Sequence, residues 1–296
     1  MDYKNKYIKY KTKYLELKNI DINNQTGGGK DIVFLFFNGG GLNEKQWVEH
    51  PYKGQLNWLN RDKEKSKTDL IDKIKTIGDI YLHTPKFYLT NEDIKNGKRF
   101  TINDLNLINY SKNVYKNINE YKKIFIISHS RGNISAKFFC KLYSKKIIGY
   151  INIDGGESDE WIEKKLNEWS KKYDYINNTE LKKLFNTANN ENNNADIISR
   201  FVKYKMYKQD YKNKYNFNNI NMLILNNIYN DNETSIIDNN YINETLMSKF
   251  IFNKKFENNN NVRSIYYVGK THYLYFYDDV KNDILDYILK ILQNNL

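Results

Sequence analysis

Ser130 stands in a sequence context that could make its hydroxyl a nucleophile. It lies in the segment 128–132, SHSRG, which follows the apolar run 124–127 and precedes a helical pattern. A strand that turns sharply into a helix at a serine forms a nucleophile elbow, with the hydroxyl exposed above the sheet. Such a serine attacks carbonyl carbons when a neighbouring base takes its proton. An ordinary strand-to-helix turn would give the same local pattern, so the base has to be sought elsewhere.

His272 is the first candidate for that base. It follows a strand-like segment over 263–268 and precedes a long helical pattern. Three other histidines compete with it. His129 precedes the serine and should point into the packing of the turn, His83 ends a strand-like segment, and His50 lies in a loop region without supporting context.

Three carboxylates could orient the imidazole of that base. Asp231 ranks first because it lies in the loop after the buried strand-like segment 221–226. Asp154 directly follows another strand-like segment and ranks second, and Glu233 ranks third. For each of them the alternative is a residue that only caps a loop.

A glycine run follows the first strand-like segment, over 32–37, and reads NGGG at 38–41. Backbone amides aimed at a developing oxyanion stabilise the transition state of acyl transfer. We expect such amides from Gly39, Gly40 and Arg131, the last being the residue after the candidate nucleophile. A phosphate cradle is the alternative, but the run lacks the Lys-Ser/Thr pair of a P-loop and the third spaced glycine of a dinucleotide fingerprint.

From Ile32 to the C-terminus, apart from one insertion, the chain resembles the α/β-hydrolase family. The order Ser, Asp, His, with each residue after a strand, is the order of that family. The glycine run resembles the family's HGGG loop, with Asn38 in place of its histidine, and Ser128 replaces the usual first glycine of the elbow. The resemblance implies a Ser-His-Asp triad of Ser130, His272 and Asp231, with Asp154 as the alternative acid.

The elements that would position these residues alternate along the chain. We predict strands at about 31–37, 78–83, 123–128, 147–153, 220–226 and 263–268, and helices at about 65–76, 102–119, 132–145 and 278–293. This alternation predicts an α/β fold, with a mostly parallel central sheet and helices on both faces. The candidate catalytic residues then fall at the carboxyl ends of strands, where such folds place their active sites.

The predicted hydrolase core comprises 30–155 and 220–296. Residues 156–219 show helical periodicity and lie where the family carries its lid, so we predict a helical lid insertion that excludes water from the site. A structural appendage is the alternative. Residues 1–29 read as a basic amphipathic helix and a linker rich in glycine and asparagine.

The N-terminal segment also bears on origin. A Tyr- and Lys-rich helix followed by a glycine run resembles the start of many giant DNA virus proteins. The segment would then be a localisation signal or a packaging signal. An extension without function is an equally weighted alternative. The compartment expected for a viral protein of this kind is the host cytoplasm or the virion.

Composition narrows the class of protein further. The 296 residues contain 47 Lys and Arg against 35 Asp and Glu, a formal charge of +12. The basic residues are spread along the chain without a nucleic-acid-binding motif, so we interpret them as solvated surface and expect no specific nucleic acid. We predict no transmembrane segment, because no apolar stretch approaches about 20 residues, and no secretory signal.

The single cysteine, Cys140, excludes an intramolecular disulfide and fits a reducing, intracellular compartment. The histidines are scattered without metal-ligand spacing, so we predict neither a metal nor a cofactor.

The favoured hypothesis is a serine hydrolase that cleaves an ester-like bond, carboxylester or lipid-like acyl, through an acyl-enzyme. The sequence does not decide whether the cleaved bond is an ester, a thioester or a peptide bond. The expected partner is a small-molecule or acyl substrate. The alternative is a catalytically silent hydrolase-like fold that binds a partner protein or an anionic surface. Nucleotide binding at the glycine run is a third reading, and the sequence leaves the oligomeric state open.

Overall fold

The structure is a computed structural model that describes residues 31–40, 42–50, 67–188, 192–211, 213, 215, 217, 219–228, 261–268, 270 and 272–294. Contacts group the described residues, except Asp31, within one unit, Ile32–Leu296. The predicted N-terminal helix and linker, Asp231 and Glu233 lie outside the described residues.

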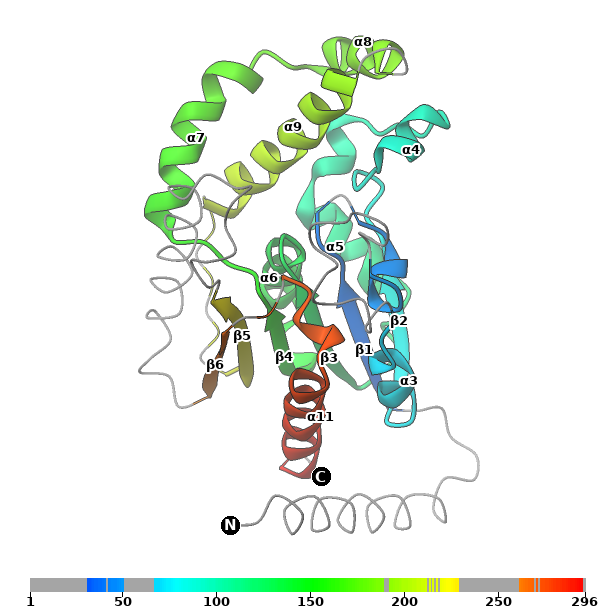
Figure 1. The fold of residues 1–296 in the computed structure, drawn as a ribbon, viewed down its shortest axis with the longest axis vertical. Helices are drawn as coiled ribbons and strands as arrows, with labels where there is room; N and C mark the ends of the chain where they lie inside the picture. The colour runs from blue at the N-terminus through cyan, green and yellow to red at the C-terminus, as the bar shows by residue number, and fades with distance from the viewer. Residues whose placement is uncertain are drawn as a thin grey trace. The chain divides into compact units, whose positions relative to one another are not determined.

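Six parallel strands form one sheet in the order β2-β1-β3-β4-β5-β6 (Figure 1). Their bounds are β1 Ile32–Phe37, β2 Asp79–His83, β3 Lys123–His129, β4 Ile147–Ile153, β5 Met222–Ile228 and β6 Val262–Val268. Each strand lies within two residues of its predicted position. The predicted α/β fold with a parallel central sheet is therefore confirmed.

The central strands form from apolar runs because the sheet is covered on both faces there. Alternate residues of β1 join two different cores. Leu35 packs in a cluster with residues of the helices on one face, whereas Phe34 and Phe36 pack in a second cluster on the other face. All three side chains are fully buried.

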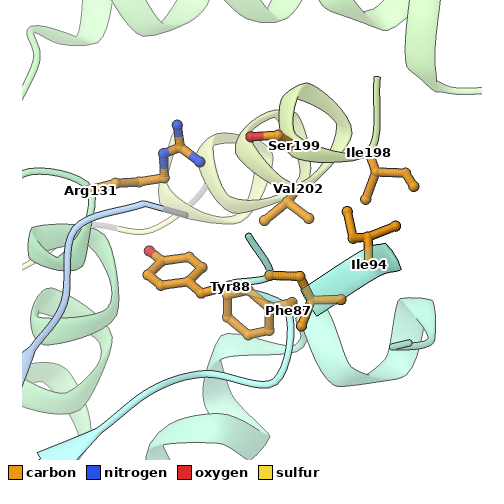
Figure 2. A pocket seen from close by; sticks show the side chains of 8 residues that line it. Phe87, Tyr88, Ile94, Arg131, Ile198, Ser199 and Val202 are labelled. Carbon is orange, nitrogen blue, oxygen red and sulfur yellow. The ribbon is translucent and has the colours of Figure 1, made fainter. Parts of the chain in front are cut away.

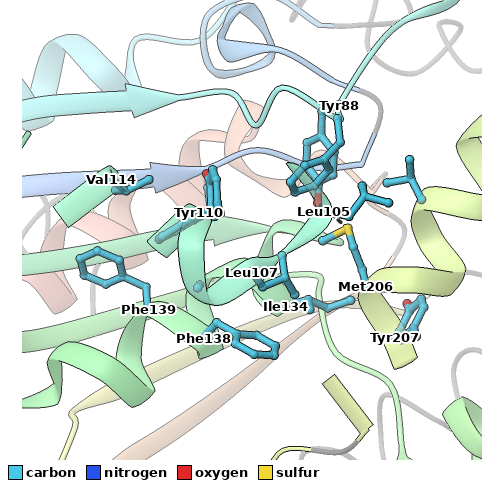
Figure 3. Close-up of a cluster of buried hydrophobic side chains, with 14 of the residues drawn as sticks. Tyr88, Leu105, Leu107, Tyr110, Val114, Ile134, Phe138, Phe139, Met206 and Tyr207 are labelled. Atoms are coloured by element: carbon cyan, nitrogen blue, oxygen red, sulfur yellow. Dashed lines mark hydrogen bonds between the residues drawn. The ribbon is translucent and has the colours of Figure 1, made fainter. Parts of the chain in front are cut away.

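Eight α-helices lie in the described part of the chain. They are α3 Leu70–Lys75, α4 Asn91–Lys95, α5 Leu107–Lys116, α6 Gly132–Tyr143, α7 Asp159–Tyr173, α8 Asn178–Thr187, α9 Asn192–Tyr211 and α11 Asp278–Gln293. Residues of α5, α6 and α9 share the first core (Figure 3). Residues of α3 and α11 belong to the second core.

The predicted helix over 102–119 is wrong in its detail, because the segment forms two elements. A 3-10 turn over Ile102–Leu105 comes first, and α5 starts after Asn106. The Asn106 side chain accepts a hydrogen bond from the Asn109 amide at 3.0 Å and so caps the first turn of α5. The short helix α4 was not predicted.

Helices α7, α8 and α9 fill the sequence between β4 and β5 and lie together beyond one end of the sheet, at the top of Figure 1. A buried ion pair joins this insertion to the core, since Lys137 Nζ on α6 lies 2.6 Å from Asp210 Oδ2 on α9. The described helices include none that is long and apolar enough to cross a membrane.

Candidate active site

The turn after β3 has the strained backbone of an elbow. Ser130 has a φ of 52°, and its amide donates to the carbonyl oxygen of Ile153 at 2.9 Å. Positive φ is uncommon for a residue other than glycine and clusters at functional sites. Gly132 allows the close approach of strand and helix, because a Cβ there would lie 2.4 Å from the Phe37 carbonyl oxygen. The sequence therefore forms the sharp turn that the pattern predicts.

Asp154 is the carboxylate that the structure brings to His272. The Nδ1 atom of His272 is hydrogen-bonded to Asp154 Oδ2, while Asp154 Oδ1 accepts from the Asn227 amide at 3.1 Å. The Asp154 amide donates to the Leu225 carbonyl oxygen at 2.6 Å, so β5 holds both the backbone and the carboxylate of Asp154. Of the three candidate acids, only Asp154 lies within the described residues. It ranked second from the sequence, below Asp231.

Asp154 shares an unusual backbone with Ser130. Its φ is 49°, and these two are the non-glycine residues with positive φ in the part of the chain that the structure describes. The two residues follow neighbouring strands, β3 and β4, at the same edge of the sheet. Gly155 packs beneath the elbow, because a Cβ there would lie 2.5 Å from the Ser130 carbonyl oxygen. The strain therefore concentrates where the candidate nucleophile and the candidate acid lie.

His129 connects the elbow to the loop that holds His272. Its Nε2 donates to the His272 carbonyl oxygen at 3.0 Å, and the centroids of the two imidazole rings are 4.5 Å apart. No hydrogen bond between the Ser130 hydroxyl and the His272 imidazole is present among the described contacts. Catalytic hydrogen bonds are often long without substrate and tighten in the complex.

The glycine loop lies against the elbow. The Gly39 amide donates to Gln46 Oε1 at 3.3 Å, and a Cβ on Gly40 would lie 2.4 Å from Cζ of Arg131. The Gly39 amide is therefore already engaged by Gln46 in this structure. Of the predicted oxyanion donors, Gly40 and Arg131 are the two whose amides make no hydrogen bond to another described residue.

Asn38 fixes the base of the glycine loop. Its Nδ2 donates to Thr84 Oγ1 at 2.8 Å, and its Oδ1 accepts from Trp47 Nε1 at 2.7 Å. Asn38 is buried. Two side-chain hydrogen bonds therefore hold the start of the glycine loop in place.

The other two histidines lie elsewhere. His50 is buried, with its ring centroid 4.8 Å from that of Tyr273 and 5.2 Å from that of Phe276. His83 packs against Tyr110 with centroids 5.2 Å apart, and burial lowers its pKa. Neither has a contact with Ser130 among the described residues.

Gln46 is a site residue that sequence reasoning missed. Its Oε1 lies 3.3 Å from His129 Nδ1 as well as from the Gly39 amide, so it joins the glycine loop to the elbow. A glutamine in the 3-10 turn Glu44–Trp47 has no sequence signature for such a role. Only the folded chain reveals it.

A small cleft opens beside the elbow, between Arg131 and the insertion helix α9 (Figure 2). Its lining is mostly apolar and consists of Phe87, Tyr88, Leu89, Ile94, Arg131, Ile198, Ser199 and Val202. Within the described residues, no group of three or more His, Cys, Asp or Glu side chains is arranged to hold a metal ion.

Solved structures share this architecture. A hydrolase from Oleispira antarctica superposes with a TM-score of 0.50 at 15% identity, over 89% of this chain and 93% of that chain. A structure from work on carboxylesterases of the thaumarchaeon Nitrososphaera gargenis gives a TM-score of 0.47 at 13% identity, over 90% and 94% of the two chains. No protein-family model and no curated protein matches the sequence. The likeness to the Oleispira antarctica hydrolase shows the fold, which is that of the α/β-hydrolases.

Proposed function

We propose that this protein is a serine hydrolase that cleaves an ester-like bond through a covalent acyl-enzyme. The observation that supports this best is the hydrogen bond between His272 and Asp154 at the sheet edge where Ser130 occupies a strained elbow. A base oriented by a buried carboxylate, beside a serine, is the arrangement that activates a hydroxyl.

In the proposed reaction, Ser130 Oγ attacks the carbonyl carbon while His272 Nε2 takes its proton. The Arg131 and Gly40 amides hold the oxyanion, at about 3–4 kcal/mol for each donor. His272 then gives the proton to the leaving alcohol oxygen, and the ester bond breaks. A water that loses its proton to His272 attacks the acyl-enzyme. His272 then gives that proton to Ser130 Oγ as the bond between Oγ and the acyl carbon breaks, which releases the acid and restores the serine. Asp154 stabilises the imidazolium in both steps.

The Ser130 hydroxyl must come within hydrogen-bond reach of His272 for this chemistry. We propose that substrate binding brings Ser130 Oγ and His272 Nε2 together, since rotation of a serine side chain is a small change. The insertion over 156–219 acts in the proposal as the lid. Its helix α9 already borders the cleft beside Arg131, and closure over bound substrate would exclude water.

Labelling by a fluorophosphonate probe tests the proposal, since the probe reacts with activated serines. We expect labelling of the wild-type protein, none of Ser130→Ala, and strongly reduced labelling of His272→Ala. Hydrolysis of short p-nitrophenyl esters should follow the same order. Equal labelling of wild type and Ser130→Ala would contradict the assignment of the nucleophile. No labelling and no hydrolysis by the wild type would favour the alternative, a silent fold that only binds.

A further inference from the structure

We propose that the Arg131 side chain recognises a carboxylate on the substrate, so that the preferred esters are anionic close to their scissile carbonyl. This inference rests on the proposed function and names its substrate class. Arg131 directly follows the candidate nucleophile, and its guanidinium extends over Gly40 into the cleft under α9 (Figure 2). A substrate whose carbonyl group reaches Ser130 therefore lies beside this cation.

The guanidinium of Arg131 is unpaired in the part of the chain that the structure describes, where it makes no hydrogen bond and no ion pair. Arg99 shows the contrast. Its Nη1 donates to the Ile94 carbonyl oxygen at 2.7 Å and to that of Lys98 at 2.8 Å. A guanidinium offers five donors in a planar fork that matches a carboxylate. The donors of Arg131 are therefore free for a ligand.

The surroundings of Arg131 favour an anion. The cleft residues around it include no acidic side chain, and most are apolar. Tyr88 and Val202, which line the same cleft (Figure 2), are both buried. A charge-assisted hydrogen bond is stronger in such low-dielectric surroundings than in water. A carboxylate bound here would therefore contribute specificity as well as affinity.

A second cation, Lys203 on α9, lies near Arg131, and Glu157 offsets part of its charge. The Lys203 ammonium lies over Trp161 and Trp169, 5.3 Å from each ring centroid, and 5.6 Å from that of Tyr207. Burial, followed by the charge of Arg131, holds the pKa of Lys203 at about 8, with Glu157 opposing the shift. Arg131 therefore lies close enough to repel Lys203, and a bound carboxylate would relieve that repulsion.

Two pairs of esters test the proposal. In the first pair, mono-p-nitrophenyl glutarate replaces the terminal methyl of p-nitrophenyl pentanoate with a carboxylate on the acyl side. In the second pair, the pentanoate ester of 4-hydroxybenzoate is compared with phenyl pentanoate, so that the carboxylate lies on the alcohol side. The readout is the ratio of kcat/KM for the anionic ester to that for its neutral counterpart. A substitution that slows the hydrolysis of both esters equally leaves this ratio unchanged, so the ratio reports only the effect of the carboxylate.

We expect the wild-type ratio to exceed one for at least one pair. Arg131→Gln keeps the backbone amide and should lower that ratio by about 10- to 100-fold, the range expected for a lost charged hydrogen bond. Arg131→Lys should restore part of it. Arg200→Gln is the matched control, because Arg200 is an exposed arginine of α9 outside the cleft lining, and it should leave the ratio unchanged.

The outcomes separate the two proposals. Ser130-dependent hydrolysis of the neutral esters, with a wild-type ratio of one or less for both pairs, overturns the anion site and leaves the hydrolase intact. If Arg131→Gln has the same ratio of kcat/KM values as the wild type, the anion site is likewise overturned and the hydrolase proposal stands. A protein that hydrolyses none of the four esters and resists the fluorophosphonate probe overturns the proposed function, and the substrate class with it.

Discussion

His129 Nε2 and the carbonyl oxygen of His272 lie 3.0 Å apart, so the residue before the candidate nucleophile holds the backbone of the candidate base. A carbonyl oxygen only accepts, and the proton of His129 must therefore reside on Nε2 in this contact. The other ring nitrogen, Nδ1, lies 3.3 Å from Gln46 Oε1, and that oxygen accepts from the Gly39 amide. The glycine loop, the elbow and the histidine loop thus pack around one buried imidazole.

Replacing His129 by alanine should misplace the His272 loop. We expect kcat to fall by about 10- to 100-fold with a smaller change in KM, because displacements of about 1 Å in a catalytic group have effects of this size. Steady-state hydrolysis of p-nitrophenyl pentanoate measures both kcat and KM. Thermal unfolding of the same variant separates misplacement from loss of the fold. Unchanged kcat in a folded His129→Ala protein would show that the contact does not position the base.

Asp154→Asn should lower kcat by about 10⁴, as the loss of the orienting carboxylate does in a comparable triad. Asp231→Asn is the matched control. It makes the same substitution at Asp231, the residue that the sequence favours as the acid of the triad. We expect that variant to keep its activity. A large loss in Asp231→Asn together with an active Asp154→Asn would reverse the assignment of the acid.

Gly132→Ala should destabilise the protein by about 1–3 kcal/mol, the usual cost of overpacking. The added Cβ would lie 2.4 Å from the Phe37 carbonyl oxygen and 2.5 Å from that of Asn38, and backbone atoms cannot move aside cheaply. Urea unfolding measures the free energy. Gly97→Ala is the comparison, because a Cβ there meets nothing within 4 Å and only the positive φ opposes it. A smaller loss at Gly132 than at Gly97 would contradict the close approach.

The lowered pKa of Lys203 predicts a pH dependence of stability. Between its folded pKa of about 8 and its usual value of 10.5, the unfolded chain binds a proton that the folded chain does not. The free energy of unfolding contributed by this group therefore rises with pH in that window. Lys203→Met removes the group, so its stability relative to wild type should decrease between pH 7 and pH 9. Parallel urea titrations measure this, and a constant difference would mean that the pKa is not lowered.

The fold could be predicted because the central strands β1, β3, β4 and β5 are short apolar runs that are largely buried. Helix limits were harder to predict. Asn106 divides the segment over 102–119 through a side-chain cap whose geometry the sequence pattern does not specify. The lid, the viral origin and the intracellular location stay predictions.

Ser130 and His272 could be proposed from the strand contexts around them, whereas the acid could not be chosen. Asp154 and Asp231 both follow strand-like segments, and the ranking depended on loop alignment. What brings Asp154 to His272 is its positive φ and its two hydrogen bonds with β5. These features arise from the pairing of β4 with β5, which involves residues distant in the sequence.

The ion pair between Lys137 and Asp210 restricts how the site can open. Both side chains are almost fully buried, at 8% and 2% exposure. Separating them would leave opposite charges unmatched in an apolar interior, which typically costs about 3–5 kcal/mol. The ion pair therefore holds α9 against α6, the helix that begins directly after the elbow. If the insertion acts as the proposed lid, its movement is therefore confined to the outer helices α7 and α8, while α9 stays attached to α6.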